Sequence, residues 1–84
     1  MPAASSSRRK YVSMDVLHTE EGKIIPTRLH WDNGKTYEID KVIDVRPGFS
    51  LKAGAAGMRY TCMILGKERY LYLADGRWFV EANL

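Results

Sequence analysis

The dipeptide Asp75-Gly76 stands between two short apolar runs, residues 70–74 and residues 77–82. An Asp-Gly pair in such a position is a strong signal for a β-hairpin with a type I′ turn, because both central residues of that turn have positive φ. The pairs that this turn predicts are Ala74 with Arg77, Leu73 with Trp78, Tyr72 with Phe79 and Leu71 with Val80. The last part of the chain is therefore expected to form antiparallel strands.

A second hairpin is indicated by the period-two pattern of residues 12–16 and residues 25–31, which is typical of half-buried strands. A two-residue turn at Glu21-Gly22 would place the apolar residues of both runs on one face of the sheet. The pairs that it predicts are Val16 with Thr27, Met14 with Leu29, and Val12 with Trp31. Pro26 lacks an amide donor, so it should lie at a sheet edge or a bulge.

The next turn contains Asp32-Asn33-Gly34. A two-residue turn at Asn33-Gly34 would place Leu29 opposite Glu38. A three-residue loop with Gly34 in the left-handed conformation instead places Leu29 opposite Tyr37. It also places Arg28 opposite Glu38 and Thr27 opposite Ile39, so the three-residue loop is preferred.

The rest of the chain is interpreted as one long strand, an irregular loop and a further strand. The strand covers residues 37–45 with a bulge near Asp40-Lys41, and residues 46–57 form the main irregular loop. Residues 58–65 form the next strand, and a turn at Lys67-Glu68 connects it to residues 70–74. The pairs expected from that turn are Leu65 with Tyr70, Ile64 with Leu71, Met63 with Tyr72, and Cys62 with Leu73. The prediction is an all-β protein with six short antiparallel strands in two meanders, which form a small barrel or a rolled sheet of SH3-like size.

The positive charge is concentrated at the N-terminus. The 13 Lys and Arg residues exceed the 10 Asp and Glu residues by three, and Arg8, Arg9 and Lys10 account for the whole excess. We predict that residues 1–10 form a disordered basic tail and that residues 11–84 form a single β domain. A neutral domain disfavours generic nucleic-acid binding through a basic surface.

Cys62 is the only cysteine, which excludes an intrachain disulfide and a zinc site of the Cys₄ or Cys₂His₂ type within one chain. The chain shows no secretory signal and no apolar run of membrane-spanning length. We therefore interpret the protein as cytoplasmic, with no membrane partner.

No set of residues with a convincing catalytic or metal-binding spacing is found. His18 and His30 are interpreted as surface histidines, and Cys62 as a small buried hydrophobic residue. The stretch of residues 54–57 has the small residues of a phosphate cradle, yet no helix and no Gly-Lys-Ser/Thr follows, so a loop is preferred. We expect no enzymatic activity, no metal and no cofactor.

The predicted C-terminal meander has two apolar faces. One is expected to pack inside the domain and carries Tyr60, Cys62, Ile64, Leu71, Leu73, Trp78 and Val80. The other carries Met63, Leu65, Tyr70, Tyr72 and Phe79. In a two-layer monomer this second face would be exposed, so we predict that it mediates self-association as a dimer or binds another protein. An alternative is that residues 46–57 cover it, with Phe49 and Leu51 as a lid.

Aromatic residues on a sheet also suit single-stranded nucleic acid, whose bases stack on them while basic side chains hold the backbone. This is the alternative function. Candidate nucleic-acid or anion contacts are Arg8, Arg9, Lys10, Lys52, Arg59, Arg69 and Arg77.

The motif Trp31-x-x-Gly34-x-x-Tyr37-x-Ile39-x-x-Val42, followed by Arg59-Tyr60 and by Trp78-Phe79-Val80-Glu81, resembles small all-β bacterial proteins of unknown function. The resemblance spans residues 12–82. It implies a fold and carries over no catalytic residues. The leading hypothesis is thus a small, non-enzymatic β interaction module.

Overall fold

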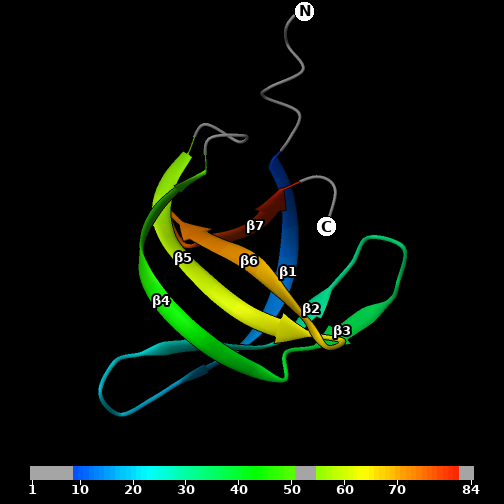
Figure 1. The fold of residues 1–84 in the computed structure, drawn as a ribbon, viewed down its shortest axis with the longest axis horizontal. Coiled ribbons are helices and arrows are strands. Elements are labelled where there is room, and N and C mark those ends of the chain that lie inside the picture. Colours follow the sequence, from blue (N-terminus) through cyan, green and yellow to red (C-terminus); the bar gives the residue numbers. More distant parts are fainter. Residues whose placement is uncertain (1–8, 51–54, 82–84) are drawn as a thin grey trace, which may run out of the picture.

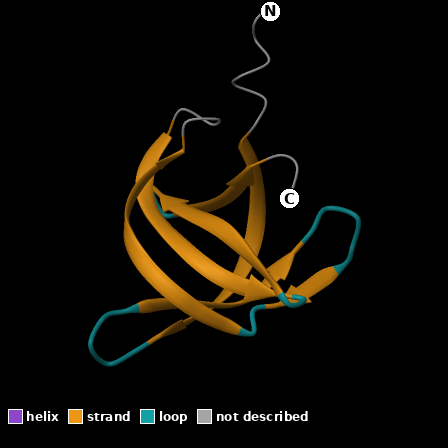
Figure 2. Cartoon of the chain, viewed as in Figure 1, coloured by secondary structure: helices purple, strands orange, loops and turns teal. Residues whose placement is uncertain are grey.

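Seven antiparallel strands form a single sheet in the order β3-β2-β1-β7-β6-β5-β4 (Figure 1). The computed structural model describes residues 9–50 and 55–81. The strands are β1 (Arg9–His18), β2 (Ile24–His30), β3 (Thr36–Glu38), β4 (Lys41–Ser50), β5 (Ala55–Ile64), β6 (Lys67–Ala74) and β7 (Arg77–Glu81). Strands and short turns make up the whole of the described chain (Figure 2). The sheet curls into a half-barrel, which confirms the predicted all-β class.

The sheet curls far enough to bring its two edge strands, β3 and β4, together through a short connection. The amide of Ile39 donates to the carbonyl of Thr27 on β2 at 3.0 Å, and the amide of Asp40 donates to the carbonyl of Met63 on β5 at 2.8 Å. The chain therefore leaves one edge of the sheet and joins the other within two residues. The prediction of one strand over residues 37–45 was wrong here, because this crossing divides it in two and gives seven strands rather than six.

The β1–β2 hairpin has a three-residue loop, so the predicted two-residue turn was wrong. The amide of Thr19 donates to the carbonyl of Lys23 at 3.0 Å, and Gly22 has a φ of 89°. This shifts Val16 opposite Pro26, but a bulge at Thr27 restores the predicted pair of Met14 with Leu29. The bulge explains how a strand that contains Pro26 keeps its apolar residues on one face.

The β2–β3 hairpin has the predicted register. The amide of Trp31 donates to the carbonyl of Lys35 at 2.8 Å, and Gly34 has a φ of 87°, which is the expected left-handed position. Leu29 pairs with Tyr37. Arg28 pairs with Glu38, and their side chains form an ion pair at 2.7 Å.

The β5–β6 turn lies at Leu65-Gly66 rather than at Lys67-Glu68, so the predicted pairs were wrong. Both turn residues have positive φ, 53° and 76°, and Ile64 pairs with Lys67. Relative to the prediction, β6 has moved by four residues along β5. Because four is even, the side chains of both strands stay on their predicted faces, except Leu65, which lies in the turn. The Asp75-Gly76 turn is as predicted, and the pairs of Ala74 with Arg77, Leu73 with Trp78 and Tyr72 with Phe79 are confirmed, whereas the ladder ends before the predicted pair of Leu71 with Val80.

Strands β4 and β5 form a long hairpin where an irregular loop was predicted over residues 46–57. Pro47 pairs with Met58, Gly48 with Gly57, and Ser50 with Ala55. Residues 47–48 and 54–57 are proline, glycine and alanine. They do not alternate between large apolar and polar side chains, so the sequence pattern does not indicate the strands. The proposed lid of Phe49 and Leu51 lies outside the described side chains.

Strand β1 begins at Arg9, two residues before the predicted start of the domain at Tyr11. Arg9 pairs with Glu81 and Lys10 with Val80, so both basic residues belong to the sheet. Residues 1–8 lie outside the described chain. The β1–β7 pairing joins the first and last strands and connects the two meanders.

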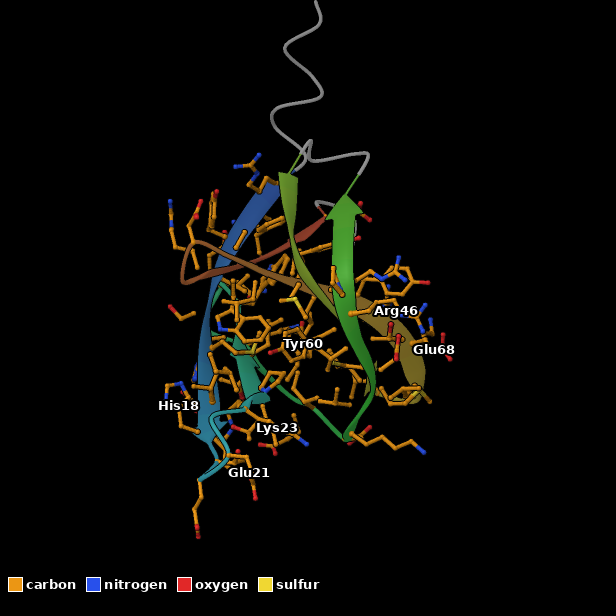
Figure 3. All side chains as sticks on the ribbon, turned by 90° about the vertical axis from the view of Figure 1, so that its left-hand side faces the viewer. His18, Glu21, Lys23, Arg46, Tyr60 and Glu68 are labelled. Carbon is orange, nitrogen blue, oxygen red and sulfur yellow. The ribbon has the colours of Figure 1, made fainter. Side chains whose placement is uncertain are left out.

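The core lies on the concave side of the sheet, as predicted. Its buried members are Leu29, Tyr60, Cys62, Ile64, Leu71, Trp78 and Val80. Figure 3 shows Tyr60 in the interior between the strands, and its ring lies 4.9 Å from that of Trp78. In the part of the chain that the structure describes, no helix has the length and apolar character needed to cross a membrane.

Candidate functional site

The convex side of the sheet carries a row of cross-strand partners from five strands. Tyr11 pairs with Phe79, Phe79 with Tyr72, Tyr72 with Arg59, and Arg59 with Arg46. Direct partners in a sheet present their side chains on the same face. These five residues, from β1, β7, β6, β5 and β4, are called the outer row below.

The centre of the outer row is closely stacked. The rings of Tyr72 and Phe79 are nearly parallel, with centroids 5.1 Å apart and 9° between their planes. Tyr11 meets Phe79 edge to face at 5.8 Å. Tyr72 and Phe79 are only 3% and 1% exposed, whereas Tyr11 is 39% exposed. The row therefore has a buried aromatic centre and an accessible aromatic end.

Arginine side chains lie over the aromatic rings of this face. The guanidinium carbon of Arg77 lies 3.7 Å from the ring centre of Tyr11, and that of Arg59 lies 4.7 Å from the ring centre of Tyr70. Arg9 lies 5.4 Å from the ring centre of Phe79 and donates to the hydroxyl of Tyr11 at 2.9 Å. Such contacts hold cationic groups against exposed aromatic surface.

The last member of the row, Arg46, has an acidic partner. Figure 3 shows Arg46 on the side of β4 away from Tyr60. Its Nε donates to Asp44 at 2.5 Å, and this hydrogen bond, together with the charge of Asp44, raises the pKa of Arg46.

Arg59 and Arg77 form no salt bridge with an acidic residue of the described chain. Among the acids in ion pairs, Asp44 lies against Arg46 at the end of the outer row, whereas Asp15 lies against His30, Glu38 against Arg28 and Asp32 against Lys10 elsewhere. Arg59 and Arg77 therefore give the outer face two positive charges that no salt bridge offsets within the described chain.

A shallow hollow borders the outer row, where the pairing of β1 with β7 ends at Val12 and Trp78. Tyr11, Ser13 and Arg77 line it, and its volume is about 500 Å³. The hollow arises because β1 turns away from β7 to pair with β2. It leaves one side of the Tyr11–Arg77 pair accessible.

The structure brings together only some of the residues predicted for an interface. Tyr70, Tyr72 and Phe79 share the outer face with Met63. Leu65 instead lies in the β5–β6 turn and is 74% exposed. The self-association surface thus stays a prediction, with two of its five members already buried in the single chain.

The predicted anion contacts also divide between the two faces. Arg9, Arg59 and Arg77 lie on the outer face. Lys10 lies on the other side of β1, where it forms an ion pair with Asp32 and lies 5.6 Å from the ring centre of Trp31. Arg69 lines a separate cavity beside Trp31, while Arg8 and Lys52 lie outside the described residues.

Sequence reasoning missed Tyr11 and Arg46 as members of this face. Tyr11 was taken as the first residue after a disordered tail, and Arg46 was assigned to a loop. The signal for Tyr11 was the alternation of residues 12–16: because Val12 and Met14 face the core, Tyr11 must face the opposite side of the same strand. No local pattern indicated Arg46, because its place in the row depends on the pairing of β4 with β5.

Cys62 and His30 lie apart, one in the core and one on the surface. Cys62 is fully buried, and burial raises the pKa of its thiol to about 11, which makes it a weak nucleophile. His30 contacts Asp15 at 3.0 Å on the surface. Over the described ranges, no three His, Cys, Asp or Glu residues cluster in a way that could hold a metal ion.

The chain was compared with known proteins at three levels. No family model matches it, and no curated protein and no solved structure is significantly similar to it.

Proposed function

We propose that the protein is a non-enzymatic module that binds single-stranded nucleic acid across the outer row. The observation that carries the proposal is the stacking of Arg77 and Arg59 on the rings of Tyr11 and Tyr70. Both rings keep accessible surface, at 39% and 45% exposure. Bases stack on aromatic rings and on guanidinium planes alike, so each pair offers a platform for a base.

The charges on this face suit a short stretch of nucleic-acid backbone. Arg59 and Arg77 have no acidic partner within salt-bridge distance among the described residues, so a phosphate could pair with them without breaking an ion pair. Two neutralised phosphates on a single strand correspond to a slope of about −1.4 in log K against log salt concentration. We therefore expect weak binding with a modest salt dependence.

A single strand fits the outer face better than a duplex. The bases of a duplex stack on one another and are not available to Tyr11 or Tyr70. The domain is also neutral overall, with 10 basic and 10 acidic residues from Tyr11 onward once the three basic residues at 8–10 are set aside from the 13 in the chain. A duplex would therefore find neither stacking nor an extended basic surface.

The proposal is tested by fluorescence anisotropy with a labelled, single-stranded pyrimidine oligonucleotide, as RNA and as DNA, at low and at moderate salt. We expect binding that weakens as salt rises and that falls about tenfold in Tyr70→Ala, since stacking of one base contributes roughly 1–3 kcal/mol. Arg77→Gln should weaken binding and make the salt slope less steep. The same sequence as a duplex should bind less tightly.

The matched control is Arg28→Gln, which removes one arginine from the β2–β3 side of the sheet. If Arg28→Gln weakens binding as much as Arg77→Gln does, the attraction is general charge and the proposed face is wrong. An absence of binding at low salt also overturns the proposal. Thermal melting of each variant distinguishes loss of binding from loss of folding.

A further inference from the structure

A cavity of about 320 Å³ opens where the two edges of the curled sheet approach each other. It lies between the β2–β3 hairpin and the β5–β6 hairpin, which stand side by side at the end of the sheet near the β3 label (Figure 1). The edge strands are not hydrogen-bonded along this seam, since the chain crosses it only through Ile39-Asp40. Side chains rather than backbone therefore line the opening.

The inner part of the cavity is apolar. Its floor includes Leu29, which is 0% exposed, and Ile64, which is 6% exposed. Trp31, which follows β2, and Tyr37, on β3, provide aromatic walls from neighbouring positions of the β2–β3 hairpin. This volume lies at the lower end of the range for small-molecule pockets, and its lining suits a flat apolar body.

The mouth of the cavity is cationic. Lys67 and Arg69 line it from β6, and no acidic residue is part of the lining. Within the described chain, neither cation has an acidic partner within salt-bridge distance. Two cations beside an aromatic cavity favour an anionic ligand, because an anion there would gain ionic hydrogen bonds from Lys67 and Arg69.

From this arrangement we infer that the cavity is a binding site for a small aromatic anion, with the ring between Trp31 and Tyr37 and the anionic group on Lys67 and Arg69. The anionic group is a carboxylate or a phosphate monoester. The site is separate from the outer row, which lies on the convex face. It does not depend on the proposed nucleic-acid function.

The inference is tested by two-dimensional NMR of the full chain with 2-naphthoate as the probe. We expect shifts concentrated at the indole N–H of Trp31 and at the backbone amides of Lys67 and Arg69. The amine 2-naphthylmethylamine has the same ring system and the opposite charge, and it should leave these resonances in place. Uridine monophosphate against uridine is the second arm, and it distinguishes a phosphate from a carboxylate ligand.

The Lys67→Ser/Arg69→Gln double variant should weaken naphthoate binding by at least about tenfold, which corresponds to roughly 1.4 kcal/mol. Lys23→Ser/Arg28→Gln removes the same charge outside the cavity and should bind as the wild type does. If Lys67→Ser/Arg69→Gln disturbs folding, Lys67→Ser alone, at an exposed position, gives the same test. Equal shifts with the amine, or no shifts with either anion, overturn the inference.

Oligonucleotide binding separates this site from the outer row. Lys67→Ser should leave the anisotropy titration unchanged, while Tyr70→Ala should leave naphthoate binding unchanged. A negative result for naphthoate binding therefore leaves the proposed nucleic-acid function standing, and a negative result for oligonucleotide binding leaves the cavity inference standing. If Lys67→Ser weakens both ligands equally, the cavity is not an independent site and the inference is wrong.

Discussion

The hydroxyl of Tyr60 donates a hydrogen bond to the backbone carbonyl of Ile24 at 2.8 Å. Tyr60 lies on β5 and Ile24 on β2, and three strands separate β5 from β2 in the sheet. The bond therefore spans the interior of the curled sheet rather than one of its ladders. It connects the two meanders at a point that no strand pairing reaches.

Replacing this tyrosine by phenylalanine tests the contribution of the bond to stability. We expect Tyr60→Phe to lower the free energy of unfolding by about 1–2 kcal/mol, because it removes the donor and leaves the carbonyl of Ile24 without its partner. Tyr70→Phe removes the same group from a side chain that is 45% exposed, and it should have almost no effect. Urea unfolding of the three proteins gives the comparison, and equal midpoints would show that the bond contributes nothing.

The buried thiol of Cys62 should make stability depend on pH in alkaline solution. Burial raises its pKa from 9.0 to about 11, so the unfolded chain loses the thiol proton at a lower pH than the folded chain does. The contribution is present in full below pH 9 and is lost as the pH rises towards 11. It amounts to roughly 2–3 kcal/mol.

The measurement is urea unfolding of Tyr60→Phe and of Tyr60→Phe/Cys62→Ala between pH 8 and alkaline pH. The double variant lacks the thiol, so the difference in unfolding free energy between the two proteins should shrink as the pH rises. Burial and the charge of Cys62 raise the pKa of Tyr60, so both proteins carry Tyr60→Phe. The ionisation of the other tyrosines then affects both proteins and cancels in the difference. A difference that stays constant with pH would contradict the prediction.

Gly57 lies where the backbones of β5 and β6 approach closely. A Cβ added at this position would lie 2.5 Å from the carbonyl oxygen of Leu73 and 2.9 Å from the Cβ of Ala74. We expect Gly57→Ala to destabilise the fold by about 2 kcal/mol or more, since backbone atoms must move to admit the methyl group.

Gly76→Ala is the matched comparison for this substitution. A Cβ at Gly76 meets no atom within 4 Å, but Gly76 has a φ of 74°. Alanine is strained in this left-handed conformation, so Gly76→Ala should lower the free energy of unfolding by about 1 kcal/mol. Thermal unfolding should rank Gly57→Ala as the less stable variant. The opposite order would mean that the strands separate easily at Gly57.

The two tyrosines of β6 on the outer face should differ in their effect on stability. Tyr72 is 3% exposed and stacks on Phe79, whereas Tyr70 is 45% exposed. We expect Tyr72→Ala to cost about 3–5 kcal/mol, as for other buried aromatic residues, and Tyr70→Ala to cost far less. Similar costs for both variants would show that Tyr72 is not part of a packed cluster.

Self-association is tested by the mass of the protein in solution. The sequence predicts a dimer through the second apolar face; of its five predicted members, the structure leaves Tyr70 exposed on the outer face and Leu65 exposed in the β5–β6 turn. We expect sedimentation equilibrium to show a dimer whose mass falls to that of the monomer, 9.6 kDa, in Leu65→Ser/Tyr70→Ser. A wild-type chain that stays monomeric at high concentration would contradict the predicted dimer.

The parts of the fold that followed from sequence are those with a strong turn signal. Asp75-Gly76 specified the β6–β7 register, and the left-handed glycine at Gly34 specified the pairing of Leu29 with Tyr37. The turn at Leu65-Gly66 was missed because a leucine with a positive φ is unusual, and a more polar pair stands two residues later. The long β4–β5 hairpin was missed because its glycine and alanine residues show no apolar alternation.

The candidate site was predictable only in part, for a related reason. The assignment of Tyr72 and Phe79 to one face followed from the turn that joins their strands. The placement of Tyr11 beside Phe79 depends on the pairing of β1 with β7, which no turn connects. The cavity beside Trp31 depends on the approach of two hairpins, and sequence reasoning named only Arg69 among its cationic residues.

The sequence by itself therefore determined the strand class and the face on which most side chains lie, because alternation and turn geometry act over a few residues. An error of four residues in the β5–β6 register left those faces unchanged, since side chains alternate with a period of two. Only the tertiary structure decided which strands from distant parts of the chain meet, as with β1 and β7 or the crossing at Ile39-Asp40. Those contacts depend on the curl of the whole sheet around its core, and they create both the outer row and the cavity at the seam.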